Sequence, residues 1–285
     1  MLMLDASAGA LDYLPCRYGT SKAVFRGPER DLSRPYVAML GGSATFGKYV
    51  ERPYPALVEA AIGLPVANLA GLNAGPDFYL SDPATLDVAA GARAAVVQVT
   101  GAEALSNPFY TVHGRRNDRF VAAAPRLHAL FPRVDFTDIH FTRHLMQVLQ
   151  RADTGRFAEL VHALQQNWLV KMRQVLSRLP ARRILLWLAD TTPPGRAESL
   201  DCAPLFIDRG LIDALRFEVS AVVHAVPSPR ARAMAPFDMT YAETEAAQAA
   251  CLPGAAVHSE VADRLASVLH SLLRMEKGPP FGDPP

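Results

Sequence analysis

The stretch PYVAMLGGSATFGK, residues 35–48, constrains the fold more than any other part of the chain. Residues 36–40 form a short, continuously apolar run that begins after a proline and ends at a pair of glycines. Such a run is typical of a strand buried on both faces of a parallel sheet. In open parallel sheets, functional groups collect beyond the carboxyl ends of the strands. Ser43, which follows this strand, is therefore the first candidate for chemistry.

The same pattern recurs along the chain and alternates with helical periodicity. Further apolar runs predict four more strands, at 65–69, 93–100, 182–188 and 219–226. Apolar residues spaced three and four apart predict helices at 55–63, 77–90, 141–151, 157–179, 208–216 and 257–275. This alternation predicts an α/β fold, a three-layer α/β/α sandwich with a short parallel sheet.

The remaining segments surround one predicted domain. Residues 1–34 are irregular and predict an N-terminal extension laid over the fold. Residues 35–275 predict a single domain, which carries an insertion of weak periodicity at about 101–155. Residues 276–285 are rich in proline and glycine and predict a disordered tail.

The composition argues against several classes of protein. The 285 residues carry 29 Lys and Arg against 28 Asp and Glu, whereas nucleic-acid-binding domains normally show a basic excess. No stretch reaches the roughly 18 uncharged apolar residues of a membrane span. The 3 cysteines fit neither a disulfide framework nor a zinc motif, and the first residues lack the regions of a secretory signal. We therefore expect a cytoplasmic protein without a metal or other cofactor, and homo-oligomerisation stays open.

Two interpretations compete for the turn after the first strand. Gly42, Gly47 and Lys48 fit G-x-x-x-x-G-K, the loop whose amides and lysine bind phosphates. Against this, Tyr49 stands where Ser or Thr would hold magnesium, and prolines interrupt the long helix that should follow. The other interpretation is a tight turn that exposes the Ser43 hydroxyl beside backbone N–H groups. A serine nucleophile in that turn requires a base within hydrogen-bond reach.

The blocks around this turn resemble those of the SGNH (GDSL-like) hydrolases, as in a divergent bacterial branch with degenerate motifs. Residues 41–47, GGSATFG, are similar to the G-D-S-x-T-x-G block of that family, with Gly42 in place of the aspartate. Residues 68–75, NLAGLNAG, resemble the block after the second strand. His258 lies at the start of the last helix, as in the D-x-x-H block, with Ala255 in place of the aspartate.

The resemblance implies a serine esterase or O-acyltransferase that uses a Ser-His dyad on an O-acyl group of a carbohydrate or small metabolite. Ser43 attacks the acyl carbonyl, and His258 takes the serine proton and later delivers it to the leaving alcohol. A backbone carbonyl or a carboxylate from elsewhere must orient the imidazole, and Asp190 is one candidate.

The resemblance also indicates which groups stabilise the oxyanion. The amide of Gly75, or alternatively Gly71, takes this role together with the amide of Ser43. In the third block Glu103 replaces the family's asparagine, so the side chain of Asn107 is the substitute donor. A charged Glu103 at that place would repel a developing oxyanion.

Three further side chains are candidates for substrate binding. Arg115 and Arg116 can clamp an anionic group, and the alternative is a solvated loop with local Arg–Asp pairs. Tyr110 can form a platform for a sugar or acyl group, and the alternative is packing in the core. Because several residues of the SGNH blocks are missing, a non-catalytic SGNH-like binding protein is the alternative function. Nucleotide binding through loop 42–48 is a weaker alternative.

Overall fold

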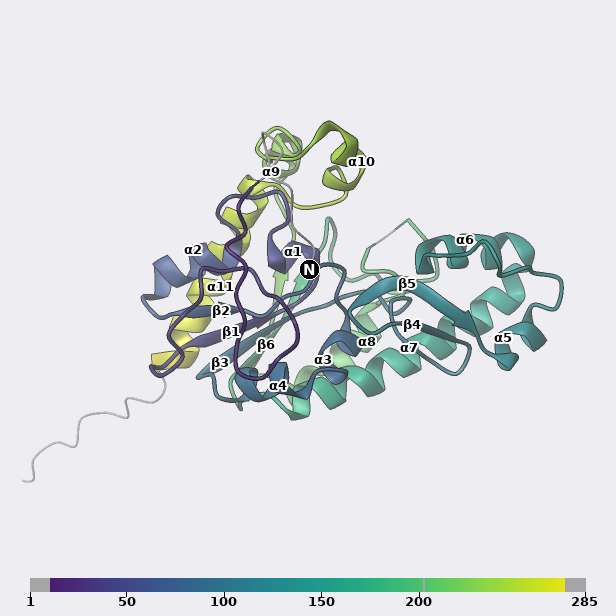
Figure 1. Ribbon diagram of the computed structural model, residues 1–285, viewed down its shortest axis with the longest axis horizontal. Coiled ribbons are helices and arrows are strands. Elements are labelled where there is room, and N and C mark those ends of the chain that lie inside the picture. Colours follow the sequence, from purple (N-terminus) through teal and green to yellow (C-terminus); the bar gives the residue numbers. More distant parts are fainter. Residues whose placement is uncertain (1–10, 202, 275–285) are drawn as a thin grey trace, which may run out of the picture.

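Five parallel strands form the central sheet, in the order β2-β1-β3-β6-β7 (Figure 1). The computed structural model describes residues 11–201 and 203–274. From β1 the chain moves to one side for β2, and then crosses to the other side for β3 and the later strands. The direction therefore reverses between β1 and β3, and ligands of such sheets bind at this reversal. The strands are β1 (Val37–Leu40), β2 (Val66–Asn68), β3 (Ala94–Gln98), β6 (Arg183–Leu188) and β7 (Ala221–Ala225).

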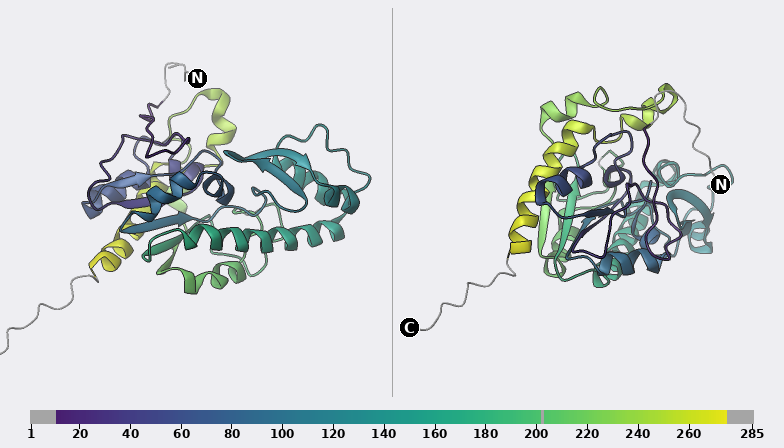
Figure 2. Two further views of the ribbon diagram at one scale, coloured as in Figure 1. Left: turned by 60° about the horizontal axis from the view of Figure 1, so that its bottom comes forward. Right: turned by 60° about the vertical axis from the view of Figure 1, so that its left-hand side comes forward.

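Helices cover both faces of the sheet (Figure 2). Successive side chains of a strand point to opposite faces, so Ala38 and Leu40 of β1 lie in one apolar core and Val37 and Met39 in the other. The first core is covered by α3 (Pro76–Leu80), α4 (Pro83–Ala90), α7 (Thr154–Ser177) and α8 (Arg209–Ala214). The second core is covered by α2 (Tyr54–Ile62), α9 (Pro229–Met234) and α11 (Ala255–Arg274).

The insertion after β3 forms a lobe beside the sheet (Figure 1). It contains the antiparallel pair β4 (Tyr110–His113) and β5 (Arg116–Ala123), followed by α5 (Pro125–Leu130) and α6 (Thr142–Ala152). Helix α7 runs from this lobe back to the sheet, and its apolar face belongs to the first core along its whole length. The core of the sheet and that of the lobe are therefore continuous.

The α/β class, the parallel sheet and the five predicted strands are confirmed. The predicted helix at 141–151 corresponds to α6. The antiparallel pair β4–β5 was not predicted, because β4 is short and β5 begins with four polar or charged residues and has only one buried side chain. Short elements were also missed, namely α1 (Ser43–Phe46), α10 (Ala246–Ala249) and the 3-10 helices η1 (Arg216–Glu218) and η2 (Glu243–Glu245). The predicted tail at 276–285 lies outside the described residues. In the part of the chain that the structure describes, no helix combines the length and apolarity needed to cross a membrane.

The N-terminal segment packs on the turn that follows β1. Cys16 and Phe25 pair in a short antiparallel bridge, and both side chains are buried. Next to them, Arg26 is buried and its guanidinium donates to the carbonyls of Phe46, Gly47, Val50 and Glu51. This segment therefore fixes the loop just beyond Ser43.

Candidate functional site

Ser43 is the first residue of α1, a single helical turn at the carboxyl end of β1. The chain must pass close to side chains here, because a Cβ added at Gly41 would overlap the Thr45 hydroxyl and the Gln98 side chain. Gln98, at the end of β3, accepts hydrogen bonds from Gly42 N and from Thr45 N and Oγ1, at 3.2, 3.3 and 2.6 Å. The glycine pair thus permits the tight turn that the sequence predicted after β1, and hydrogen bonds to Gln98 of β3 hold this turn.

The Ser43 hydroxyl is engaged by a single partner residue. Its Oγ donates to Asn73 Oδ1 at 2.9 Å and accepts from Asn73 N at 3.0 Å. Asn73 is exposed and has a φ of 54°, a left-handed conformation that asparagine tolerates better than most residues. Among the described residues, the backbone N–H groups of Ser43 and Ala44 have no hydrogen-bond partner. The site therefore combines a half-exposed hydroxyl, a side-chain amide and two free N–H groups.

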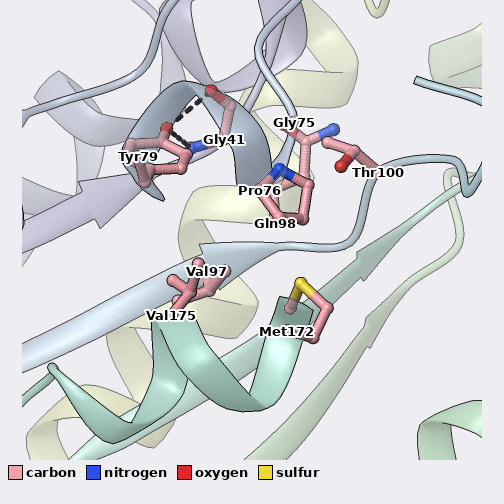
Figure 3. A pocket seen from close by; sticks show the side chains of 9 residues that line it. All are labelled: Gly41, Gly75, Pro76, Tyr79, Val97, Gln98, Thr100, Met172 and Val175. Atoms are coloured by element: carbon pink, nitrogen blue, oxygen red, sulfur yellow. Dashed lines mark hydrogen bonds between the residues drawn. The ribbon is translucent and has the colours of Figure 1, made fainter. Parts of the chain in front are cut away.

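A small cavity lies beneath this turn (Figure 3). Its volume is about 10 Å³, which is room for roughly one water molecule. The Tyr79 hydroxyl beside it accepts from Gly41 N at 2.6 Å and donates to Gly41 O at 2.9 Å. The cavity is too small for a ligand, so binding at this edge requires the surface around Ser43 and Asn73.

His258 lies at the start of the last helix, as predicted, but its surroundings were not predicted. It lies in the first turn of α11 with only 1% of its surface exposed, and its ring stacks on Tyr54. Its Nδ1 accepts a hydrogen bond from Tyr54 N at 3.0 Å, which satisfies a free N–H at the start of α2. Because Nδ1 is an acceptor, the proton of the neutral ring resides on Nε2.

This arrangement corrects the expected dyad. His258 Nε2 is buried and has no hydrogen-bond partner among the described residues, so it makes no bond to Ser43. Burial, helped by the positive charge of Arg26, lowers the pKa of His258 from 6.5 to about 3. The expected orienting acid is also absent, because Asp190 is exposed at the end of β6 and makes no bond to this ring. A neutral ring with its proton on Nε2 cannot accept the proton of Ser43.

The three expected oxyanion donors are committed to other bonds. Gly71 N donates to Gly41 O at 3.2 Å, and Gly75 N donates to Asn117 Oδ1 at 2.7 Å. The Asn107 side chain donates to Leu105 O and accepts from the amides of residues 109 and 110, so it shapes its own loop. These three donors therefore hold the loops in place, and of the oxyanion donors expected from the sequence only the Ser43 amide is free among the described residues.

Asn117 is a site-forming residue that the sequence did not single out. It is fully buried, and its Oδ1 accepts from Gly75 N and Phe78 N while its Nδ2 donates to His113 O and Gly114 O. These bonds attach the β4–β5 turn to the loop that carries Asn73. Asn117 stands among charged residues at 115–118 (RRND), and this stretch has no periodic pattern that could have identified Asn117 as buried.

The expected substrate-binding residues do not form one site, because the two arginines lie at the exposed β4–β5 turn whereas Tyr110 lies in the core. Arg115 and Arg116 are both exposed, and Arg116 pairs with Asp118 at 3.3 Å, as the alternative of a solvated loop predicted. Tyr110 is buried, and its hydroxyl donates to Glu103 O at 2.7 Å. Tyr110 therefore packs in the core and offers no surface to a substrate.

The loop 42–48 does not have the form of a phosphate cradle. Its amides from Thr45 to Lys48 are bonded within the turn or to Gln98, and the turn is followed by neither a long helix nor a free lysine. The Lys48 ammonium instead pairs with Glu245 at 3.0 Å and donates to Gln248 at 2.9 Å. This disfavours the nucleotide-binding alternative.

Glu103, in the loop after β3, is partly buried, and one of its carboxyl oxygens is fully shielded from solvent. Its Oε2 lies against Gly101, where an added Cβ would overlap it, and has no hydrogen-bond partner among the described residues. Burial raises the pKa of Glu103 to about 7, so the carboxyl is largely protonated in mildly acidic solution.

In the described part of the chain, His, Cys, Asp and Glu side chains form no cluster of 3 or more that could hold a metal ion.

Comparison with protein families gives one match. Residues 1–273 match the model of a domain of unknown function, DUF6473, and the chain belongs to that family. No curated protein and no solved structure matches the chain. The family match spans the N-terminal segment, the sheet and the lobe.

Proposed function

We propose that this chain is a binding protein of SGNH-like fold that takes a small, uncharged polar ligand, such as a carbohydrate or metabolite ester, and does not hydrolyse it. The SGNH-like part of the proposal is supported by where the blocks lie. Three of them follow β1, β2 and β3 at the carboxyl edge of the sheet, and His258 lies in the first turn of the last helix.

The observation that carries the proposal is the state of the Ser43 hydroxyl. Asn73 occupies both its donor and one acceptor position, and no base reaches it among the described residues. A serine hydroxyl is a weak nucleophile unless a base takes its proton. Ser43 as it stands is a hydrogen-bonding group, not an activated nucleophile.

The chemistry of the edge favours an uncharged ligand. The groups available there are the hydroxyl of Ser43, the amide of Asn73 and the free N–H groups of residues 43 and 44. These groups suit carbonyl and hydroxyl oxygens, and none of them carries a charge that would select an ion. A neutral ester or polyol satisfies them without the cost of removing a charge from water.

A second candidate function is the serine esterase or O-acyltransferase. The free N–H of Ser43, next to its half-exposed hydroxyl, favours it, because an oxyanion donor and a nucleophile then belong to one residue. In this alternative His258 must break its bond to Tyr54 N, exchange its tautomer and reach Ser43. The two candidates therefore differ in whether His258 leaves the core.

A covalent probe separates the two. Wild-type protein and Ser43→Ala are incubated with a fluorophosphonate probe and with p-nitrophenyl acetate, next to an active serine esterase. We expect no label at Ser43 by mass spectrometry and equal, background rates of ester cleavage. Labelling of Ser43 together with turnover that Ser43→Ala abolishes would overturn the binding proposal and support the esterase.

Ligand binding is measured separately with acetylated xylobiose as the probe. Saturation-transfer NMR is expected to detect binding to the wild type and a weaker signal for Asn73→Ala. Asn167→Ala is the control, because this asparagine of α7 bonds the carbonyl of Ser106 and none of the groups around Ser43. Equal signals in all three proteins, or no signal in any of them, would contradict the proposed ligand class.

A further inference from the structure

The segment between α9 and α11, residues 236–252, reaches back over the turn that follows Ser43. We name this segment the strap. It contains η2 and α10, and only Ala249 of its side chains is fully buried, whereas Phe237 is 85% exposed. With so little buried surface of its own, the strap depends on a few specific contacts to keep its position.

Those contacts converge on Lys48 and Tyr49. Glu245 accepts from Lys48 Nζ at 3.0 Å and from the Tyr49 hydroxyl at 2.9 Å. Thr240 N donates to Tyr49 O at 2.8 Å, and the ring of Tyr241 packs edge-on against the ring of Tyr49 at 5.7 Å. The tip of the strap therefore grips two adjacent residues of the turn.

Tyr49 needs such support because of its backbone. Its φ is 71°, in the left-handed region that side chains larger than asparagine rarely adopt. A conformation of this kind persists only where surrounding contacts fix it. On one side of Tyr49 those contacts come from the N-terminal segment, through Tyr13 and Arg26, and on the other side they come from the strap.

Lys48, one of these two residues, is bonded directly to Ser43. Lys48 N donates to Ser43 O at 3.1 Å, and Gly47 N donates to the same carbonyl at 3.0 Å. A change in the backbone of Lys48 and Tyr49 therefore reaches the Ser43 turn through a single hydrogen bond. The N-terminal segment holds the carbonyls of residues 46, 47, 50 and 51 through Arg26 and the amide of Tyr49 through Tyr13. The strap holds the Lys48 side chain and the carbonyl and ring of Tyr49.

We propose that the strap is a conformational latch: attached, it holds Lys48 and Tyr49 in the strained form that orders the Ser43 turn, and detached, it lets that turn relax. The inference concerns the free chain, so it holds whichever molecule binds at the edge. It goes beyond the proposed binding function, because it predicts motion of the site in the absence of a ligand.

Hydrogen exchange of the free protein tests the latch. Glu245→Ala removes the charged one of the two acceptors that Lys48 and Tyr49 share, the other being Gln248 Oε1. Glu243→Ala is the matched control, since Glu243 is an exposed glutamate of the same 3-10 helix. We expect Glu245→Ala to speed exchange at the amides of residues 47–50 and of Thr240 by about three- to ten-fold, the size of losing a part-exposed ion pair and a charged hydrogen bond. Glu243→Ala is expected to leave these rates unchanged.

A second variant tests whether the effect of Glu245→Ala is only a local change in η2. Lys48→Met breaks the ion pair from the other side and is expected to accelerate exchange at Thr240, which lies in the strap. Near-UV circular dichroism verifies that each variant stays folded. Faster exchange in the strap with unchanged rates at residues 47–50 in Glu245→Ala would overturn the latch, and so would equal acceleration by Glu243→Ala.

Discussion

Replacing His258 by asparagine removes a titratable group but keeps a hydrogen-bond acceptor for the start of α2. The Oδ1 of asparagine lies close to where Nδ1 of histidine accepts from Tyr54 N, so the bond at 3.0 Å has a substitute. The substitution therefore separates the proton chemistry of the ring from its packing. It asks directly whether His258 is a buried neutral residue or a base available for catalysis.

The sign of the pH dependence follows from the two states of His258. In the unfolded chain the ring binds a proton below its ordinary pKa of 6.5, whereas in the folded chain burial lowers that pKa to about 3. Its contribution to stability is complete above pH 6.5 and is lost as the pH falls toward 3. Each pH unit in this window costs about 1.4 kcal/mol, so the loss between about pH 7.5 and pH 5 is about 2 kcal/mol.

Glu103 titrates in the opposite sense and must be separated from His258. Burial raises its folded pKa from 4.5 to about 7, so its contribution to stability is complete below pH 4.5 and is lost as the pH rises through 7. In the wild type the contributions of His258 and Glu103 to the free energy of unfolding partly cancel between about pH 4.5 and pH 6.5, because one rises with pH while the other falls. The difference between the wild type and His258→Asn, measured at each pH, isolates the histidine.

Urea unfolding of both proteins from about pH 5 to pH 7.5 supplies that difference. We expect the free energy of unfolding of His258→Asn to gain about 2 kcal/mol on the wild type as the pH falls across this range. Parallel curves for the two proteins would refute the reasoning. A titration of the His258 ring near pH 6.5 in NMR spectra of the folded wild-type protein would also refute it. That result would restore His258 as a candidate base.

Three further substitutions test other parts of the site. Glu103→Gln removes the carboxyl that loses its proton as the pH rises, so this variant is expected to exceed the wild type by about 3 kcal/mol at pH 8 and to match it at pH 4.5 in urea unfolding. Arg26→Met leaves buried carbonyls of the loop after Ser43 without a donor and is expected to lower the free energy of unfolding by about 3 kcal/mol, whereas the exposed Arg17→Met changes it by less than about 0.5 kcal/mol. Asn117→Ala removes a fully buried side chain with four hydrogen-bonded partner groups and is expected to cost about 3 kcal/mol, and a loss below 1 kcal/mol would show that the β4–β5 turn docks by other contacts.

The sequence by itself determined the five strands of a parallel sheet and the place of Ser43 after the first of them, whereas the order of the strands came from the structure. The apolar run at residues 36–40 and the glycines that follow it are local signals, because a buried strand and a tight turn each restrict nearby residues. The helical repeat likewise located α7 and α11 to within a few residues. Such features depend on contacts that the pattern itself encodes.

Only the tertiary structure decided what the polar residues do. His258 sits at the start of the last helix as the resemblance required, but the packing of α11 on α2 buries its ring and turns Nδ1 to Tyr54 N. Position 75 holds the expected glycine, but its N–H donates to the side chain of Asn117, more than forty positions away in the sequence. The partner of a polar group, its exposure and hence its pKa depend on which distant segments fold against it, and no local pattern in the chain carries that information.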